Sequence, residues 1–295
     1  TEFFVTGSLQ YFIGRRIGYT IPSFSELKRC LKYSVPLTIS IVASEASSRA
    51  DRLLIGVFLG PAAVGIYSIS YSIASFVMVY STPLQTSFFP EISRLLEEGQ
   101  EEECGNILQT GVRYFLIISI PTVVGMYLIG PDVIKLISTA EAAEAAPQLL
   151  PVVAAGMVLW GLEQLYGVIP VANEETISVS KIRGFTAGAN ILMNALLIPI
   201  AGIVGAAIAT LLSYFTSSLC LYFKTNSEIK ANFYWKSAIR VVASSTIMLV
   251  IVFQFINGEL FMTLLIAPVV YFVSLIGIGE ISTSELERAY EVIQL

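Results

Sequence analysis

Long apolar runs alternate with short polar connections along the chain. Eight of these runs approach the roughly 20 mostly apolar residues that a membrane-spanning helix needs. The predicted spans are 33–59, 62–90, 111–130, 148–171, 178–199, 201–223, 237–256 and 259–279. Apolar stretches of this length and number predict an all-α polytopic membrane protein.

Two polar segments extend this pattern beyond the membrane. Residues 91–106 are rich in glutamate, and we expect them to continue a span as a helix with a solvated acidic face. The tail at 280–295 places Leu286, Tyr290 and Ile293 on one side of a short helix. We expect that amphipathic tail to lie on the membrane surface.

The composition supports the membrane assignment and excludes several functions. The 295 residues are 55% hydrophobic and 13% charged, whereas an ordinary soluble domain carries about 25% charged residues. The basic residues are scattered, so we expect no nucleic-acid partner. The chain has no histidine, and Cys30, Cys104 and Cys220 lie far apart. We therefore expect no metal site, no cofactor and no disulfide framework.

Lysine and arginine are distributed unequally between the two sets of connections. Basic residues favour the cytoplasmic side of a membrane protein. If the linker at 14–32 is cytoplasmic, then the connections near 91–113, 173–183 and 224–240, and the tail from 280, fall on the same side. These regions hold fourteen of the basic residues, and the opposite connections hold only Lys135. Arg49 and Arg52 remain, inside the first full span.

Arg49 and Arg52 belong to a charged stripe within an apolar helix. In a helix over 33–59, Glu45, Arg49 and Arg52 share one face at spacings of four and three residues. Asp51 points away from that face by about 120°. Counted from Tyr33, Glu45 sits about 18 Å along the helix, so the stripe starts near the midplane of the membrane.

A charge at that depth costs about 2.5–3.5 kcal/mol, so such residues are kept away from lipid. One interpretation is local pairing, with Glu45 bound to Arg49 and Asp51 bound to Arg52 or a neighbouring helix. The other gives Arg49 and Arg52 an anionic ligand, because guanidinium groups match phosphate oxygens with two parallel donors. For Asp51 we favour the structural role.

Three more polar residues lie inside predicted spans. Glu163 needs a partner or a proton; it can pair with Arg49, or bind a coupling ion or proton. Asn190 and Asn194 share one helix face, and amides often join membrane helices. A ligand contact is the alternative for them. The following segment, 202–210, is a face of small residues suited to close packing.

Two stretches resemble a known transporter family. Residues 33–76 contain the pattern D-R-x-x-I-G-x-x-x-G from Asp51 to Gly60, followed by G-I-Y at 65–67. Residues 188–214 contain N-x-x-x-N-x-x-x-I-P-x-x-G-x-x-G-A-A-x-A-T from Asn190 to Thr210. Both resemble the C-terminal part of Wzx-type polysaccharide flippases. These belong to the superfamily of oligosaccharidyl-lipid flippases that also contains the MATE multidrug exporters and the lipid II flippase.

The resemblance implies an arrangement of domains. Residues 1–32 are the end of a preceding transmembrane helix and a cytoplasmic linker, and 33–223 are the C-terminal six-helix lobe of a two-lobed transporter. Residues 224–279 are two additional transmembrane helices, and 280–295 are the tail. The N-terminal lobe is missing from this sequence, so we expect a truncated piece, although a split gene or a self-associating lobe would also fit.

The function implied is translocation of a polyprenyl-phosphate-linked oligosaccharide across the cytoplasmic membrane for surface polysaccharide synthesis, by alternating access. Such a flippase is not an enzyme and is expected to have a cationic cavity. Arg49, Arg52 and Glu45 are then the candidate substrate-binding residues. The alternative is a MATE-like multidrug antiporter coupled to Na⁺ or H⁺ through Glu163 or Asp51. The expected partners are the lipid-linked oligosaccharide, membrane lipid, the N-terminal lobe and a coupling ion.

Overall fold

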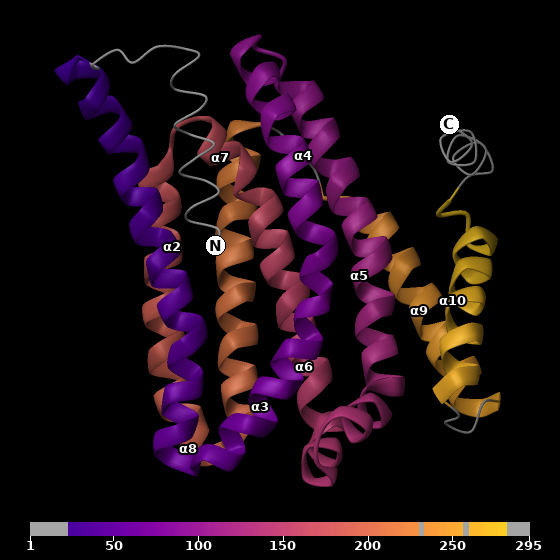
Figure 1. The fold of residues 1–295 in the computed structure, drawn as a ribbon. Helices are drawn as coiled ribbons and strands as arrows, with labels where there is room; N and C mark the ends of the chain where they lie inside the picture. Colours follow the sequence, from indigo (N-terminus) through magenta and orange to yellow (C-terminus); the bar gives the residue numbers. More distant parts are fainter. Residues whose placement is uncertain (1–22, 230–232, 256–259, 282–295) are drawn as a thin grey trace, which may run out of the picture.

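The computed structural model describes residues 23–229, 233–255 and 260–281. Within these ranges the regular elements are helices, and the long ones run side by side in one bundle (Figure 1). The prediction of an all-α polytopic protein is confirmed for this part of the chain. The predicted end of a preceding span and the amphipathic tail lie outside the described residues.

The described helices reproduce the predicted spans and extend most of them. They are α2 (Phe24–Leu59), α3 (Pro61–Ala74), a short 3-10 helix η1 (Ser75–Val77), α4 (Met78–Glu97), α5 (Glu101–Ile137), α6 (Ala140–Tyr166), α7 (Val168–Ala172), α8 (Thr176–Glu228), α9 (Trp235–Phe255) and α10 (Leu260–Gly277). Six helical stretches in this part of the chain are long and apolar enough to cross a membrane. Helix α2 is not among them, because polar and charged residues interrupt its apolar run.

Helix α2 is continuous through the charged stripe. The Ser23 hydroxyl accepts a hydrogen bond from the backbone N–H of Glu26, and the Glu26 carboxylate accepts one from the backbone N–H of Ser23. This reciprocal cap fixes the start of the helix. The helix ends at Gly60, whose φ of 89° suits glycine, and Pro61 opens the next helix. The stripe therefore lies on 36 residues of uninterrupted helix.

The span predicted at 62–90 lies within one helical stretch, Pro61–Glu97, which contains a short 3-10 turn. Residues 75–77 form a 3-10 turn between α3 and α4. The Ser75 hydroxyl donates to the carbonyl of Ser72 at 2.6 Å, and the Ser72 hydroxyl donates to that of Ser68 at 2.8 Å. Such side-chain bonds to the backbone compete with regular helical bonds and bend helices.

The expectation of one helix through 91–106 is wrong. Helix α4 ends at Glu97, and α5 begins at Glu101. Gly99 has a φ of 73° and its N–H bonds back to the carbonyl of Leu96, which ends the helix at a tight turn. The acidic residues therefore sit at a reversal of the chain.

Helix α8 contains two predicted spans, 178–199 and 201–223, folded back on each other. It runs for 53 residues but has a non-helical conformation at Gly202, with φ 60° and ψ −143°. The Asn190 amide reaches the Thr210 hydroxyl at 3.4 Å, although twenty residues of straight helix would span about 30 Å. At the far ends, Lys224 lies 2.5 Å from Glu175. The two arms of α8 therefore form an antiparallel hairpin.

The bundle has a main core and a smaller second one. Helix α2 packs on α8 at one side of the bundle, and α9 and α10 lie at the opposite side (Figure 1). A separate apolar cluster joins α9 and α10 to α5. Glu280, just after α10, accepts hydrogen bonds from Arg113 at 2.7 Å and Ser237 at 2.5 Å. That contact ties the end of α10 to α5 and α9.

Candidate functional site

The charged stripe lies on the outer face of α2. Arg49 Nη2 is 3.4 Å from Glu45 Oε2, and the two side chains are 74% and 60% exposed. The long separation and the high exposure make this a weak ion pair. Glu45 and Arg49 thus point away from the described bundle, and the Arg49 guanidinium keeps donors available for another acceptor.

Arg52 leaves the stripe and turns toward α3. Its guanidinium carbon lies 4.5 Å from the centroid of the Tyr71 ring, a cation–π contact. Its Nε is buried with no hydrogen-bond acceptor among the described residues. A half-buried guanidinium is suited to an anionic oxygen, because part of its desolvation cost has already been met by the fold.

Asp51 is a packing residue between α2 and α3. Its side chain is fully buried, accepts a hydrogen bond from the Tyr67 hydroxyl at 2.9 Å, and accepts another from the backbone N–H of Arg52 at 2.7 Å. Both carboxylate oxygens are therefore engaged. Asp51 points away from the exposed side of α2, so it does not cancel the charge of Arg49 there.

Glu163 pairs with Arg183, not with Arg49. Arg183 Nε lies 2.8 Å from Glu163 Oε1, and the side chains are 12% and 5% exposed. The same guanidinium donates to the Gln164 side chain at 2.7 Å. From the sequence, Arg183 was expected only as part of the connection near 173–183. Arg183 is the sixth residue of the span predicted at 178–199, and that position could have indicated a contact inside the bundle.

Asn190 and Asn194 join three helical segments. The Ser47 hydroxyl on α2 donates to Asn190 Oδ1 at 3.0 Å, and Asn190 Nδ2 donates to Thr210 on the second arm of α8. Asn194 Nδ2 donates to Asn190 Oδ1 at 3.0 Å. The amides hold α2 against the α8 hairpin. The contacts of Asn190 with Ser47 and Thr210 were not predicted from the sequence, because helical spacing does not show which helices meet.

A small polar cavity connects these groups. It has a volume of about 30 Å³ and lies between α2, α6 and α8, with Ser47, Glu163, Arg183, Asn190 and Thr210 among its lining residues. This is enough for a water molecule and too little for a sugar or a drug. Of these polar groups, the stripe on α2 alone faces outward, which makes it the candidate ligand contact.

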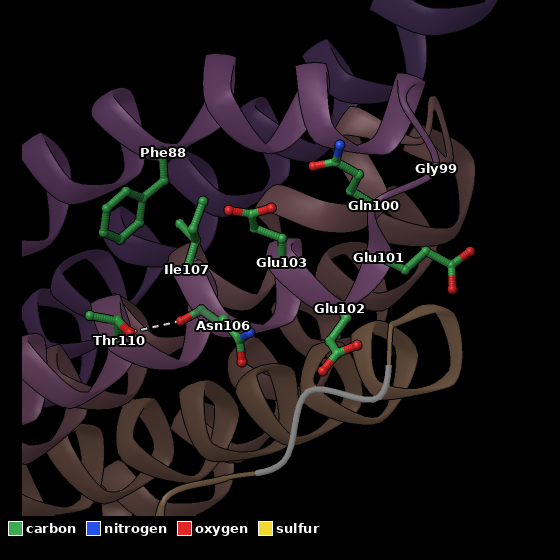
Figure 2. Close-up of a pocket in the computed structure, with 9 residues that line it drawn as sticks. All are labelled: Phe88, Gly99, Gln100, Glu101, Glu102, Glu103, Asn106, Ile107 and Thr110. Atoms are coloured by element: carbon green, nitrogen blue, oxygen red, sulfur yellow. Dashed lines mark hydrogen bonds between the residues drawn. The ribbon is translucent and has the colours of Figure 1, made fainter.

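The acidic turn between α4 and α5 borders an open surface. It borders an open hollow of about 790 Å³ lined by Phe88, Gln100, Glu103 and neighbours. Figure 2 shows the side chains of Glu101, Glu102 and Glu103 pointing in three different directions. No group of histidine, cysteine or acidic side chains within the described ranges is arranged to hold a metal ion.

The family comparison covers most of the chain. The family model described as "Lipid II flippase MurJ" matches residues 9–278. Two curated relatives come from Haloferax volcanii. "Probable low-salt glycan biosynthesis flippase Agl15" is 22% identical over 79% of this chain and 49% of its own length. "Probable flippase AglR" is 30% identical over 57% of this chain and 36% of its own length. The chain thus spans about half or less of the relatives it matches.

Solved structures share the fold. The lipid II flippase MurJ in an inward closed conformation matches with a TM-score of 0.70 and 16% identity, over 87% of this chain and 55% of that one. An outward-facing MATE multidrug transporter matches with a TM-score of 0.61 and 19% identity, over 89% and 67%. At these identities the likeness shows the fold of the wider transporter superfamily and does not separate its branches.

Proposed function

Because the chain belongs to the lipid II flippase MurJ family, we propose that it forms the C-terminal lobe of a flippase for polyprenyl-phosphate-linked oligosaccharides. The family is one of membrane transporters, not of enzymes. Two relatives carry names of glycan or flippase function, which favours a lipid-linked glycan as the cargo. In this proposal the cargo crosses the cytoplasmic membrane for surface polysaccharide assembly.

The observation that carries this proposal is the exposed charge in the middle of α2. Arg49 is ten residues from Leu59, the last residue of α2, and therefore about 15 Å from that end. The hydrocarbon core is about 30 Å thick, so Arg49 lies near its centre. A guanidinium at that depth is not left against acyl chains. The outer face of α2 must meet a water-filled cavity or another part of the transporter.

A cavity on that face would suit an anionic head group. Asp51 is turned inward, so the charges on the outer face are Glu45 and Arg49, with the half-buried Arg52 beside them against the Tyr71 ring. The three groups together carry a net charge of +1. A phosphate or diphosphate can accept paired hydrogen bonds from Arg49 and replace the weak contact with Glu45. We place a second lobe opposite α2, so that alternating access carries this site from one side of the membrane to the other.

The orientation follows from the basic residues. At the end of the bundle where α2 begins, Arg29 contacts Glu174 at 2.5 Å and Lys224 contacts Glu175 at 2.5 Å. The same end holds Arg113 and Arg240, which contact Glu280. Basic residues collect on the cytoplasmic side, so we place this end in the cytoplasm.

The alternative, a cation-coupled multidrug antiporter, has less support. It needs an acidic group that is open to a cationic drug or a coupling ion. Glu163 is held by Arg183, and Asp51 is held by Tyr67 and a backbone N–H. Both carboxylates are buried and satisfied, so neither offers a free negative charge to the outer face of α2.

The proposal is tested by removing the two guanidinium groups in the complete transporter. Arg49→Ala and Arg52→Ala, singly and together, should abolish surface polysaccharide in cells that lack their own flippase, with the protein still present at normal abundance. The readouts are glycan staining and a membrane immunoblot.

Arg94→Ala is the matched control, because Arg94 is an exposed arginine at the end of α4 that pairs only with Glu91 and Glu98. It should leave the polysaccharide unchanged. Normal polysaccharide in the Arg49 and Arg52 double variant would show that these groups do not bind the cargo.

A further inference from the structure

We propose that an anionic phospholipid binds with its phosphate in a basic pocket at the start of α2. The pocket has a volume of about 530 Å³ and lies between the first turns of α2 and the turn that joins α7 to α8. Its lining includes Lys28, Arg29, Lys32, Tyr33 and Glu174. The proposal does not depend on the cargo of the transporter.

The pocket carries positive charge that the described residues do not neutralise. Arg29 Nη2 lies 2.5 Å from Glu174 Oε1, and this ion pair ties α2 to the α7–α8 turn. Lys28 and Lys32 are exposed, with no carboxylate within 4 Å among the residues that the structure describes. Glu26, in the same turn, is engaged by the cap at Ser23. Two adjacent ammonium groups are therefore free for an anion.

An exposed apolar stripe begins beside these lysines. Phe24, Leu27, Leu31 and Val35 are all exposed, and their spacing of three and four residues places them on one face of α2. Viewed along the helix axis, Lys28 lies beside this stripe, and Lys32 lies next to Lys28 on the side away from the stripe. A lipid can thus hold its phosphate against the lysines while an acyl chain runs toward the membrane interior along Leu31 and Val35.

The pocket lies at the edge of the membrane, at and just beyond the level of the lipid head groups. Lys32 and Lys28 are 27 and 31 residues from Leu59, which places them about 40–47 Å from that end of a helix near the membrane normal. The hydrocarbon core is about 30 Å thick, and the bilayer with its head groups about 40–45 Å. With Arg49 near the centre, the backbone of Lys32 lies just beyond the head groups, and its long side chain can reach back to a phosphate. Lys32 is also about 25 Å along the helix from Arg49, so the basic pocket and the charged stripe are separate sites.

These features favour a membrane phospholipid over a soluble phosphate compound. Basic pockets between transmembrane helices at this level attract acidic head groups. A soluble phosphate would use the lysines but gain nothing from the apolar stripe. The lipid has both parts, and it reaches the pocket from within the membrane.

The test compares lipid retention by native mass spectrometry of the purified chain in mixed micelles. Phosphatidylglycerol is the probe, and phosphatidylcholine with the same acyl chains is the neutral comparison. The wild-type chain should retain one phosphatidylglycerol that withstands collisional activation. The double variant Lys28→Gln/Lys32→Gln should bind this lipid about thirtyfold more weakly, the factor that two basic side chains contribute at an anionic surface.

Two control variants make the result specific. Lys28→Arg/Lys32→Arg keeps the charges and should retain the lipid. Lys181→Gln/Lys236→Gln removes two exposed lysines outside the pocket and should also retain it. Equal retention by wild type and the Lys28/Lys32 glutamine variant, or equal retention of phosphatidylcholine, would overturn the proposal. Displacement of the lipid by millimolar glycerol phosphate would instead assign the pocket to a soluble phosphate, which also overturns it.

Discussion

Buried and exposed charges in the described helices fall into two groups. The three buried carboxylates, Asp51, Glu163 and Glu280, each accept a hydrogen bond from a side chain on another helix or helical arm. Burying a charge is tolerated when it is paired and hydrogen-bonded. Glu45 and Arg49 differ, because both are exposed and the ion pair between them is long, at 3.4 Å. That contrast separates the charges that hold the fold together from those that we propose to face a ligand.

The first residue-scale prediction concerns the Glu163–Arg183 pair. Glu163→Gln leaves the Arg183 guanidinium buried without its carboxylate, and breaking a buried pair costs roughly 3–5 kcal/mol. We expect a clear fall in the apparent melting temperature of the purified protein. The double variant Glu163→Gln/Arg183→Gln removes both charges and should recover part of the loss. If the loss of stability in the double variant equals the sum of the losses in Glu163→Gln and Arg183→Gln, the two side chains do not stabilise each other.

Helical spacing identified part of this chemistry from sequence alone. The angle between Asp51 and the Glu45–Arg49 face follows from 100° per residue, and Asp51 does point inward in the structure. Arg183 could not be assigned to Glu163 in that way, because the contact crosses between α6 and α8. Periodicity within one helix carries no information about which helices meet.

At the level of single elements, the α8 hairpin depends on two glycines. Gly202 has a φ of 60° and a ψ of −143°, a backbone conformation that residues other than glycine rarely adopt. Gly205 lies against the opposite arm, where an added Cβ would come within 2.3 Å of the Leu197 carbonyl oxygen. The arms can approach closely because the following segment is rich in buried alanine at 206, 207 and 209.

Gly205→Ala is therefore expected to force the two arms of α8 apart. The opposing atoms belong to the backbone, so a side-chain rearrangement cannot relieve the clash. We expect low yield of folded protein and loss of a monodisperse peak in size-exclusion chromatography. Gly188 lies on the first arm, where an added Cβ would meet open space. Gly188→Ala should therefore behave as wild type. Normal folding of Gly205→Ala would show that the arms are not packed at this distance.

Element boundaries were predicted less well than element identity. The boundary predicted between the spans 178–199 and 201–223 correctly divided α8 into two arms, because Pro199 and Gly202 lie at its turn. The turn at 98–100 was missed, since the run of glutamates favours helix and a single glycine was the one contrary signal. The 3-10 turn at 75–77 was not predicted, because serine hydroxyls bond to the backbone there without any change in hydropathy.

At the scale of the whole molecule, hydropathy and basic residues predict the number and direction of the spans. Antiparallel helices of membrane length bring the connections with basic residues to one end of the bundle (Figure 1). The sequence does not reveal that α2 exposes its charged face, because exposure depends on how α2 packs against α8.

Site-directed labelling in cells tests the proposed orientation. In a variant without the native cysteines, Gln100→Cys introduces a thiol at the turn between α4 and α5, and Glu141→Cys introduces one at the start of α6. Both positions are exposed, at opposite ends of α5. A membrane-impermeant maleimide should label Glu141→Cys in intact cells and Gln100→Cys only after permeabilisation. The reverse pattern would show that the proposed orientation is inverted.

The most direct measurement is the affinity of the complete transporter for a polyprenyl-diphosphate oligosaccharide in lipid nanodiscs. A charged hydrogen bond contributes about 1.5–3 kcal/mol, so Arg52→Gln and Arg49→Gln should each weaken binding on the order of 10–100-fold. Arg94→Gln should bind as wild type. If the double variant Arg49→Gln/Arg52→Gln binds the lipid-linked sugar with the wild-type dissociation constant, the outer face of α2 is not where the anionic head is held.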